Sequence, residues 1–166
     1  WKDDPLFIRD VMEMLDNVLQ YFIDNAPDEI SRARYSAMME RSVGLGALGF
    51  HAYLQKHNIP FESVMAKAVN IKLFKHIKNK VDKADLELGA LRGEAPDQEG
   101  TGKRFSCRMA VAPNASTSFI MGNTSPSVEP VPANIYRQDT LSGSYTNRNK
   151  YLDIIIKKAV SYTHLR

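Results

Sequence analysis

The stretch APNASTSFIMGNTSPSVEP, residues 112–130, is the most informative part of this chain. Pro113 ends an apolar segment, and the small residues after it leave consecutive backbone N–H groups and hydroxyls clear of side-chain bulk. Donors arranged in this way can bind an anion such as a phosphate. On composition alone, a capped turn rich in Ser and Thr that binds no ligand is the favoured interpretation. The small residues are Asn114, Ala115, Ser116, Thr117 and Ser118.

The segments on either side of this stretch have the patterns of strands and a helix. In RFSCRMAVAP, residues 104–113, apolar side chains recur at every second position from Phe105 to Val111, which predicts a β-strand over residues 105–112. NIYR and TLSGSYTNRN, within residues 134–149, predict strands or a hairpin around Ser142 and Gly143. Residues 149–160, NKYLDIIIKKAV, return to a helical pattern.

The first half of the chain is helical in pattern. Residues 5–25 place apolar side chains on one helical face, with Asp4 before Pro5 as a start signal. The longest helix has a polar face rich in lysine; because no aromatic residues are interleaved with the lysines, a solvated face is favoured over a phosphate-binding surface. The apolar face of the first helix consists of Ile8, Val11, Leu15, Val18, Leu19 and Phe22. Further helices are predicted over residues 28–40, 47–57 and 62–91.

Gly44, Gly46 and Gly49 have the G-x-G-x-x-G spacing of dinucleotide-binding folds. That fingerprint requires a buried strand before it and an acidic residue at the end of a second strand about 20 residues later. Neither is present, because a charged segment precedes the glycines and a helical pattern follows them. The favoured interpretation is that the glycines let the end of a strand and the start of a helix pack closely.

Composition limits the class of protein. The chain has 166 residues, 43% of them hydrophobic and 25% charged, which predicts one ordinary soluble domain with a real core. A net charge of +3 is too small to imply binding to nucleic acid or to a membrane, and a single cysteine excludes an internal disulfide framework. No apolar stretch suggests a membrane span or a signal peptide, so a cytoplasmic setting is expected. The chain starts at Trp1, and we expect it to be cut from a longer protein.

Three motifs occur in a specific order. They are APNASTS at residues 112–118, MGNTSPSVEP at residues 121–130, and ANIYRQDTLSGSYTNRNKYL at residues 133–152. This order resembles the catalytic barrel of the ribonucleotide reductase large (alpha) subunit. The earlier RSVGLGALGFHAYLQKHNIPFES, residues 41–63, is also similar to that family. The resemblance covers most of residues 41–152 and, less distinctly, the first helix.

The resemblance implies an α/β fold, with this chain forming a section of the family's ten-stranded α/β barrel and a helix-rich first half. Residues 1–160 would be a partial catalytic barrel domain truncated at both ends, and residues 161–166 a non-native or unstructured tail. The resemblance also assigns a loop that grips the diphosphate of a ribonucleoside diphosphate, mostly through backbone N–H groups and through two hydroxyls. This agrees with the anion-binding interpretation of the small residues and reverses the preference for a turn without a ligand. The loop consists of Pro113, Asn114, Ala115, Ser116 and Thr117, with the hydroxyls on Ser116 and Thr117.

The family reduces ribonucleoside diphosphates to deoxyribonucleoside diphosphates for DNA synthesis, using a thiyl radical on an N-x-C-x-E loop. That loop is absent, and Cys107 lacks both flanking residues, so we expect it to be a small buried hydrophobe. No catalytic residue is therefore expected within this section. The alternatives left open are the adenosylcobalamin-dependent class of the same enzyme and a non-catalytic helical interaction module.

The resemblance also implies cofactors and partners for the complete subunit. The radical generator would be a di-metal small subunit or adenosylcobalamin, and the reductant a thioredoxin or glutaredoxin. The complete large subunit is expected to form a homodimer, with no cofactor or metal bound by this section and no nucleic acid or membrane partner.

The remaining polar and aromatic candidates have structural interpretations. His51, His57 and His76 have no carboxylate or second histidine at ligand spacing, so packing is favoured over a metal site. Glu129 is expected to shape its turn by hydrogen bonding, and Tyr136 and Tyr145 to pack on strands.

Overall fold

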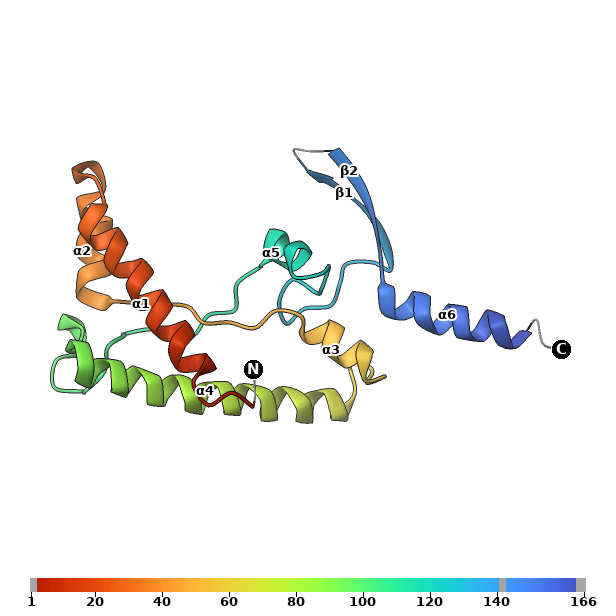
Figure 1. Ribbon diagram of the computed structural model, residues 1–166, viewed down its shortest axis with the longest axis horizontal. Helices are drawn as coiled ribbons and strands as arrows, with labels where there is room; N and C mark the ends of the chain where they lie inside the picture. Colours follow the sequence, from red (N-terminus) through yellow and green to blue (C-terminus); the bar gives the residue numbers. More distant parts are fainter. Residues whose placement is uncertain (1–2, 141–142, 164–166) are drawn as a thin grey trace. The chain divides into compact units, whose positions relative to one another are not determined.

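The computed structural model describes residues 3–140 and 143–163. The chain divides into two compact units, and the helices and strands of both are labelled in Figure 1. Unit 1 consists of Trp1–Gly46 and Ala68–Ala112, and unit 2 of Ala47–Lys67 and Pro113–Arg166. Helix α4 (Val64–Arg92) contributes residues to both.

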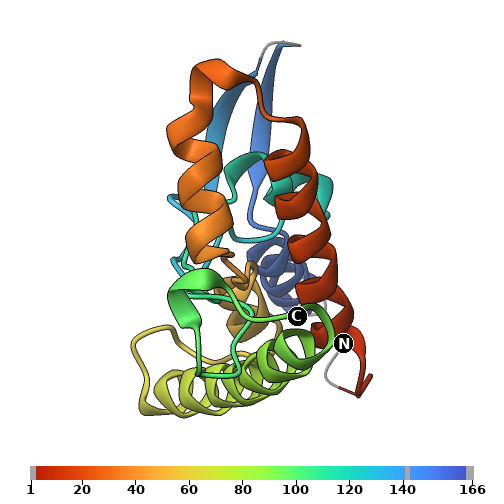
Figure 2. The ribbon, with the colours of Figure 1, turned by 90° about the vertical axis from the view of Figure 1, so that its left-hand side faces the viewer.

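Unit 1 starts with α1 (Phe7–Asn25), followed by a 3-10 turn at Asp28–Ile30 and by α2 (Ser31–Glu40). The Oδ1 atom of Asp4 accepts a hydrogen bond from the N–H of Leu6 (2.9 Å) directly before α1, but the N-cap is Leu6 and no side chain caps the helix, so Asp4 precedes the helix without capping it. Helices α1 and α2 contact each other and lie side by side (Figure 2). A second 3-10 turn, Pro96–Gln98, follows α4.

The buried side of α1 differs from the predicted apolar face. Its buried residues are Ile8, Met12 and Asp16, which follow one another at a spacing of four, whereas Val18 is 61% exposed. Ile8 of the predicted face is thus confirmed as buried, and Val11, Leu15, Leu19 and Phe22 are half-buried; the prediction was wrong at Val18 and missed Met12 and Asp16. The physical reason is that Asp16 is held inside by arginines, which brings Met12 into the core with it. The core also contains Ile77, Val81, Ala84 and Leu88 of α4, and Phe105.

The glycine-rich segment and the predicted strand at residues 105–112 meet in unit 1. Leu45 and Met109 form an isolated parallel bridge, with hydrogen bonds from the N–H of Leu45 to the carbonyl of Arg108 (3.0 Å) and from the N–H of Ala110 back to that of Leu45 (3.1 Å). A Cβ atom on Gly46 would lie 2.4 Å from the Ala110 carbonyl oxygen, so this pairing requires glycine. The two segments are extended here, but the pairing is too short to form a regular strand.

Cys107 precedes this pairing and is exposed, so the expectation of a buried hydrophobe was wrong. Only its backbone takes part in the pairing, because its carbonyl accepts a hydrogen bond from the N–H of Val43 (2.9 Å).

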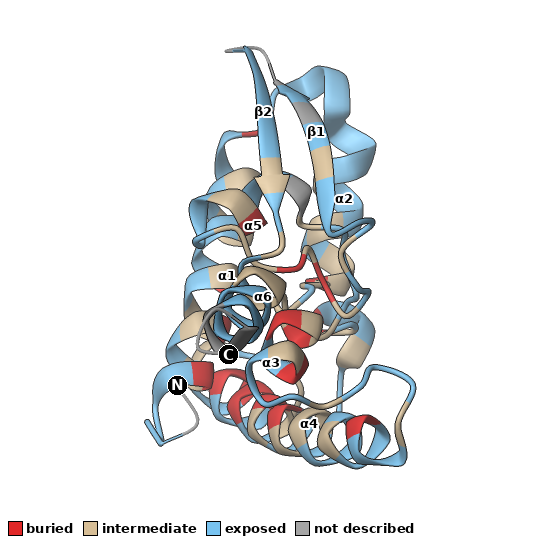
Figure 3. Cartoon of the chain, turned by 90° about the vertical axis from the view of Figure 1, so that its right-hand side faces the viewer, coloured by how far each residue is buried: buried red, intermediate tan, exposed pale blue. Residues whose placement is uncertain are grey.

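Unit 2 contains α3 (Phe50–Lys56), α5 (Ala115–Ile120), the strands β1 (Ile135–Thr140) and β2 (Gly143–Arg148), and α6 (Lys150–Thr163). The strands form the predicted antiparallel hairpin, with Ile135 opposite Arg148 and Thr140 opposite Gly143. Ser142, where the turn was predicted, lies outside the described residues. Most of the hairpin surface is exposed or intermediate (Figure 3).

Side-chain caps fix the starts of two helices. Ser63 Oγ accepts a hydrogen bond from the N–H of Ala66 (3.1 Å) at the start of α4. Asn149 Oδ1 accepts hydrogen bonds from the N–H groups of Tyr151 (3.2 Å) and Leu152 (3.4 Å) at the start of α6. Helix α6 reaches Thr163, and the rest of the expected tail, residues 164–166, lies outside the described residues. No helix in the described part of the chain has the length and apolar character that a membrane span requires.

Candidate functional site

The loop predicted to bind a diphosphate lies at the start of α5 in unit 2 (Figure 1). Pro113, Ser116 and Thr117 are exposed, and Asn114 is half-buried. The first hydrogen bond inside α5 runs from the N–H of Ser118 to the carbonyl of Asn114 (2.9 Å). The N–H groups of residues 115–117 therefore have no acceptor within the helix. The five predicted residues are brought together as one turn, with amide donors next to exposed hydroxyls.

A second segment, residues 124–127, holds both ends of this loop. The carbonyl of Pro126 accepts a hydrogen bond from the N–H of Asn114 (3.1 Å). The N–H of Thr124 donates to the carbonyl of Ser118 (3.0 Å). We call residues 124–127 the support segment. Because it binds the loop before and after its exposed residues, it fixes the distance between the two ends.

The support segment also binds the start of α3. The N–H of Gly49 donates to the Ser125 carbonyl (2.8 Å), that of Phe50 to the Ser127 carbonyl (3.3 Å), and that of Ala52 to the Ser125 hydroxyl (3.2 Å). In a dinucleotide-binding fold, N–H groups at this position would face the pyrophosphate. Here they are occupied by the protein itself, so the glycine motif supports a neighbouring loop instead of binding a nucleotide.

Gly49 is required at this contact for a steric reason. Its φ of 82° lies in the left-handed region, and a Cβ atom there would lie 2.7 Å from Oγ1 of Thr124. A side chain would therefore be strained and would also push the support segment away from α3.

His51 has a structural role in unit 2. Its Nδ1 atom accepts a hydrogen bond from the N–H of Val131 (3.3 Å), and its ring packs edge-on against Phe61. Burial lowers the pKa of His51, which favours the neutral ring that this acceptor role requires. Within residues 3–140 and 143–163, no cluster of three or more His, Cys, Asp or Glu side chains could hold a metal ion.

Other candidates from the sequence lie apart from this loop. Glu129 and Tyr145 are exposed, and Tyr136 is half-buried on β1. His57 packs against the ring of Tyr53, with 4.2 Å between the ring centroids. None of these side chains is brought to the residues of the predicted diphosphate loop by a hydrogen bond between described residues.

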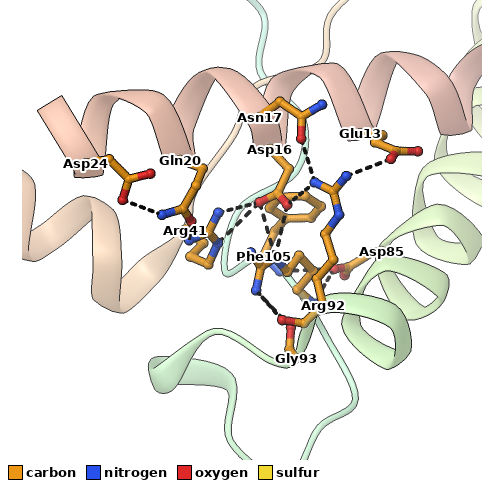
Figure 4. A network of polar contacts seen from close by, with 11 residues as sticks. Glu13, Asp16, Asn17, Gln20, Asp24, Arg41, Asp85, Arg92, Gly93 and Phe105 are labelled. Atoms are coloured by element: carbon orange, nitrogen blue, oxygen red, sulfur yellow. Dashed lines mark hydrogen bonds and ion pairs between the residues drawn. The ribbon is translucent and has the colours of Figure 1, made fainter.

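Sequence reasoning missed the buried ionic network of unit 1 (Figure 4). Oδ1 of Asp16 accepts hydrogen bonds from Arg41 Nη2 (2.6 Å) and Arg104 Nε (3.1 Å), and Oδ2 accepts one from Arg92 Nη1 (2.8 Å). Burial opposes the charged form of this carboxyl, but the hydrogen bonds from the three arginines outweigh it and lower the pKa of Asp16. Asp16 is thus a fixed anion that joins chain segments. No local sequence signal marked it, because an aspartate in an amphipathic helix normally faces solvent.

Asp85 of α4 plays a similar part in unit 1. Its Oδ1 atom accepts hydrogen bonds from the N–H groups of Arg104 (2.8 Å) and Phe105 (3.0 Å), and its Oδ2 atom one from Arg108 Nη1 (2.7 Å). This buried carboxylate ties the chain at residues 104–108 to the helix.

A family model described as "Ribonucleotide reductase, barrel domain" matches residues 4–101 and 95–164. The chain belongs to this family. The ribonucleotide reductase resemblance of its motifs is therefore confirmed, as is the α/β fold of a barrel section. The match extends well before residue 41, and so includes the first helix, where the sequence motifs alone were less distinct.

Relatives in the ribonucleotide reductase family cover nearly all of this chain. It is 59% identical to the ribonucleoside-diphosphate reductase large subunit of Invertebrate iridescent virus 6 over 97% of this chain and 17% of the relative. It is 54% identical to the corresponding subunit of Invertebrate iridescent virus 3 over 96% of this chain and 25% of the relative.

A solved structure in the family agrees with this fold. The Actinobacillus ureae class Id ribonucleotide reductase alpha subunit superposes with a TM-score of 0.84 at 35% identity, over 96% of this chain and 29% of that chain. This chain spans about a sixth to a quarter of the length of the large subunits of Invertebrate iridescent viruses 6 and 3.

Proposed function

We propose that this chain is a section of a ribonucleoside-diphosphate reductase large subunit, an oxidoreductase that converts ribonucleoside diphosphates to deoxyribonucleoside diphosphates. The names of the viral relatives support this assignment, together with their identity of 54% and 59% to nearly all of the chain. Because the chain spans 17% and 25% of those relatives, the activity is proposed for the complete subunit.

Within that subunit, residues 113–117 bind the diphosphate of the substrate. The observation that carries this assignment is the group of N–H donors at residues 115–117, which lack an acceptor within α5 and adjoin the exposed Ser116 and Thr117. Donors of this kind, fixed by the support segment, suit phosphate oxygens because they need no reorganisation on binding.

The rest of the reaction depends on groups outside this section. The radical cysteine of an N-x-C-x-E loop is not in this sequence, and Cys107 does not have that context. The complete subunit would work with a radical generator and a thioredoxin or glutaredoxin reductant. A relative named as a large subunit implies a small partner subunit. This favours a small subunit over adenosylcobalamin as the radical generator.

The test is to change Ser116 in the complete subunit and measure the affinity for CDP. Ser116→Pro removes one N–H and the hydroxyl and should distort the loop, so CDP binding should weaken by about 1–3 kcal/mol. Ser116→Ala is the control that keeps this N–H and removes only the hydroxyl. Unchanged CDP affinity in Ser116→Pro would exclude the loop assignment and favour a turn without a ligand.

A further inference from the structure

Ser125 is the fully buried centre of the support segment. Its hydroxyl accepts a hydrogen bond from the N–H of Ala52 (3.2 Å), and its carbonyl accepts one from the N–H of Gly49 (2.8 Å). One residue therefore makes two hydrogen bonds to the first turn of α3 and the residue before it. Both bonds lie within unit 2.

The residues on either side of Ser125 hold opposite ends of the diphosphate loop. Thr124 donates to the Ser118 carbonyl, and the Pro126 carbonyl accepts from Asn114. Helix α3 is thus connected to each end of the loop in three steps. The first is a hydrogen bond to Ser125, the second is one peptide unit to Thr124 or Pro126, and the third is a hydrogen bond between that residue and the loop. A shift of Ser125 relative to α3 would move both ends of the loop.

We propose that Ser125 is a positioning residue for the substrate diphosphate. Its hydroxyl fixes the support segment against α3, and the support segment in turn sets the spacing between Asn114 and Ser118 and the direction of the amides at residues 115–117. This inference rests on the proposed function of the loop. It adds a residue that touches no substrate but determines how the loop meets it.

The hydroxyl bond matters because its donor is buried. Ala52 is 5% exposed, so loss of the Ser125 hydroxyl would leave the N–H of Ala52 without an acceptor and out of reach of bulk water. The backbone can recover an acceptor only by moving α3 and the support segment relative to each other. Because Thr124 and Pro126 are hydrogen-bonded to the two ends of the loop, this movement would displace the loop as well.

The chain offers a matched control two residues away. Ser127 is also a buried serine, 1% exposed, but its Oγ atom has no hydrogen-bond partner among the described residues. Ser127→Ala removes the same atom from a similar environment without breaking a hydrogen bond. A difference between the two alanine variants therefore reports the Ser125 bond and not the loss of a buried hydroxyl in general.

The experiment measures kcat and KM for CDP in the complete subunit with its radical generator and reductant. We expect Ser125→Ala to raise KM roughly 3- to 10-fold with kcat changed by less than about twofold. A displaced loop would bind the substrate in its ground state and in the transition state less tightly by the same amount. Ser127→Ala keeps the Ser127 carbonyl that binds Phe50 and breaks no side-chain hydrogen bond, so it should raise KM much less than Ser125→Ala does. Ser125→Cys, which keeps the volume but has a poor acceptor, should raise KM in the same direction and serves if Ser125→Ala does not fold.

Cytidine separates the diphosphate from the rest of the substrate. Ser125→Ala should weaken CDP binding but leave the affinity for cytidine unchanged, whereas a general loss of structure would weaken both. If Ser116→Pro weakens CDP binding while Ser125→Ala behaves like Ser127→Ala, the positioning role of Ser125 is overturned and the proposed function stands. If Ser116→Pro has no effect on CDP binding, the proposed function itself fails.

Discussion

The Arg41 guanidinium donates from Nη2 to Oδ1 of Asp16 over 2.6 Å, and both side chains are buried. Arg41 also ends α2 in the left-handed conformation, with a φ of 47°. The residue that ends α2 therefore also binds the neighbouring helix α1 through its side chain. Because Arg92 and Arg104 donate to the same carboxylate, the ends of α2 and α4 and the chain before Phe105 are all fixed to the middle of α1.

Asp16→Asn should destabilise this region by about 3–5 kcal/mol, because it removes the carboxylate and leaves buried guanidinium groups without a counter-charge. The measurement is the unfolding midpoint in urea. Asp97→Asn, at an exposed position of unit 1 outside this network, is the control and should change stability by less than about 0.5 kcal/mol. Equal midpoints for the two variants would contradict a stabilising role for the network.

The same carboxylate predicts a dependence of stability on acid pH. The pKa of Asp16 is lowered below 3.8 in the folded state, so its contribution is fully present above that value and is lost as the pH falls through the folded pKa. The difference in unfolding free energy between the wild type and Asp16→Asn should therefore be constant near neutral pH and shrink in strong acid. A difference that grows on acidification would refute this sign.

The elements of the fold were largely predictable from local pattern. Helices α1 and α4 follow from apolar periodicity, because this signal acts over a few residues. The buried face of α1 was not predictable in this way. An aspartate in an amphipathic helix normally faces solvent, and only arginines 25, 76 and 88 residues away keep Asp16 inside.

The candidate site was predictable only in part for a related reason. The five loop residues follow from a contiguous motif, whereas Ser125 acts through a partner 73 residues away. Likewise, the alternation at residues 105–111 predicted a full strand, but the described chain pairs it only with the short segment around Leu45. Local alternation of apolar residues indicates an extended backbone, but it does not indicate how many other segments that backbone pairs with.

His51 should make stability fall on mild acidification. Its pKa is lowered below 6.5 in the folded state, so the contribution of the neutral ring is present above pH 6.5 and is lost as the pH falls through the folded pKa. Protonation at Nδ1 would also replace the acceptor for the Val131 N–H with a donor. An NMR titration of the His51 ring should give a pKa below 6.5, and a higher value would show that the ring is not buried as described.

Cys107→Ala should leave turnover of the complete subunit within about twofold of the wild type, because this thiol lacks the flanking groups of a radical cysteine. Its side chain is exposed in the described chain, so the stability cost should be less than about 0.5 kcal/mol. Steady-state CDP reduction checks this prediction. An inactive but folded variant would give Cys107 a catalytic role.

The variants Gly44→Ala and Gly46→Ala should respond differently to the same second substitution, Ala110→Gly. An added Cβ at Gly44 would lie 2.9 Å from the Cβ of Ala110, whereas one at Gly46 would lie 2.4 Å from the Ala110 carbonyl oxygen. Each glycine-to-alanine change should destabilise the protein by about 1–3 kcal/mol through overpacking. Adding Ala110→Gly removes the atom that opposes Gly44→Ala but leaves the carbonyl that opposes Gly46→Ala. Urea midpoints of the double variants should therefore recover for the first pair only, and recovery of both would mean that backbone pairing between these segments is not what requires glycine.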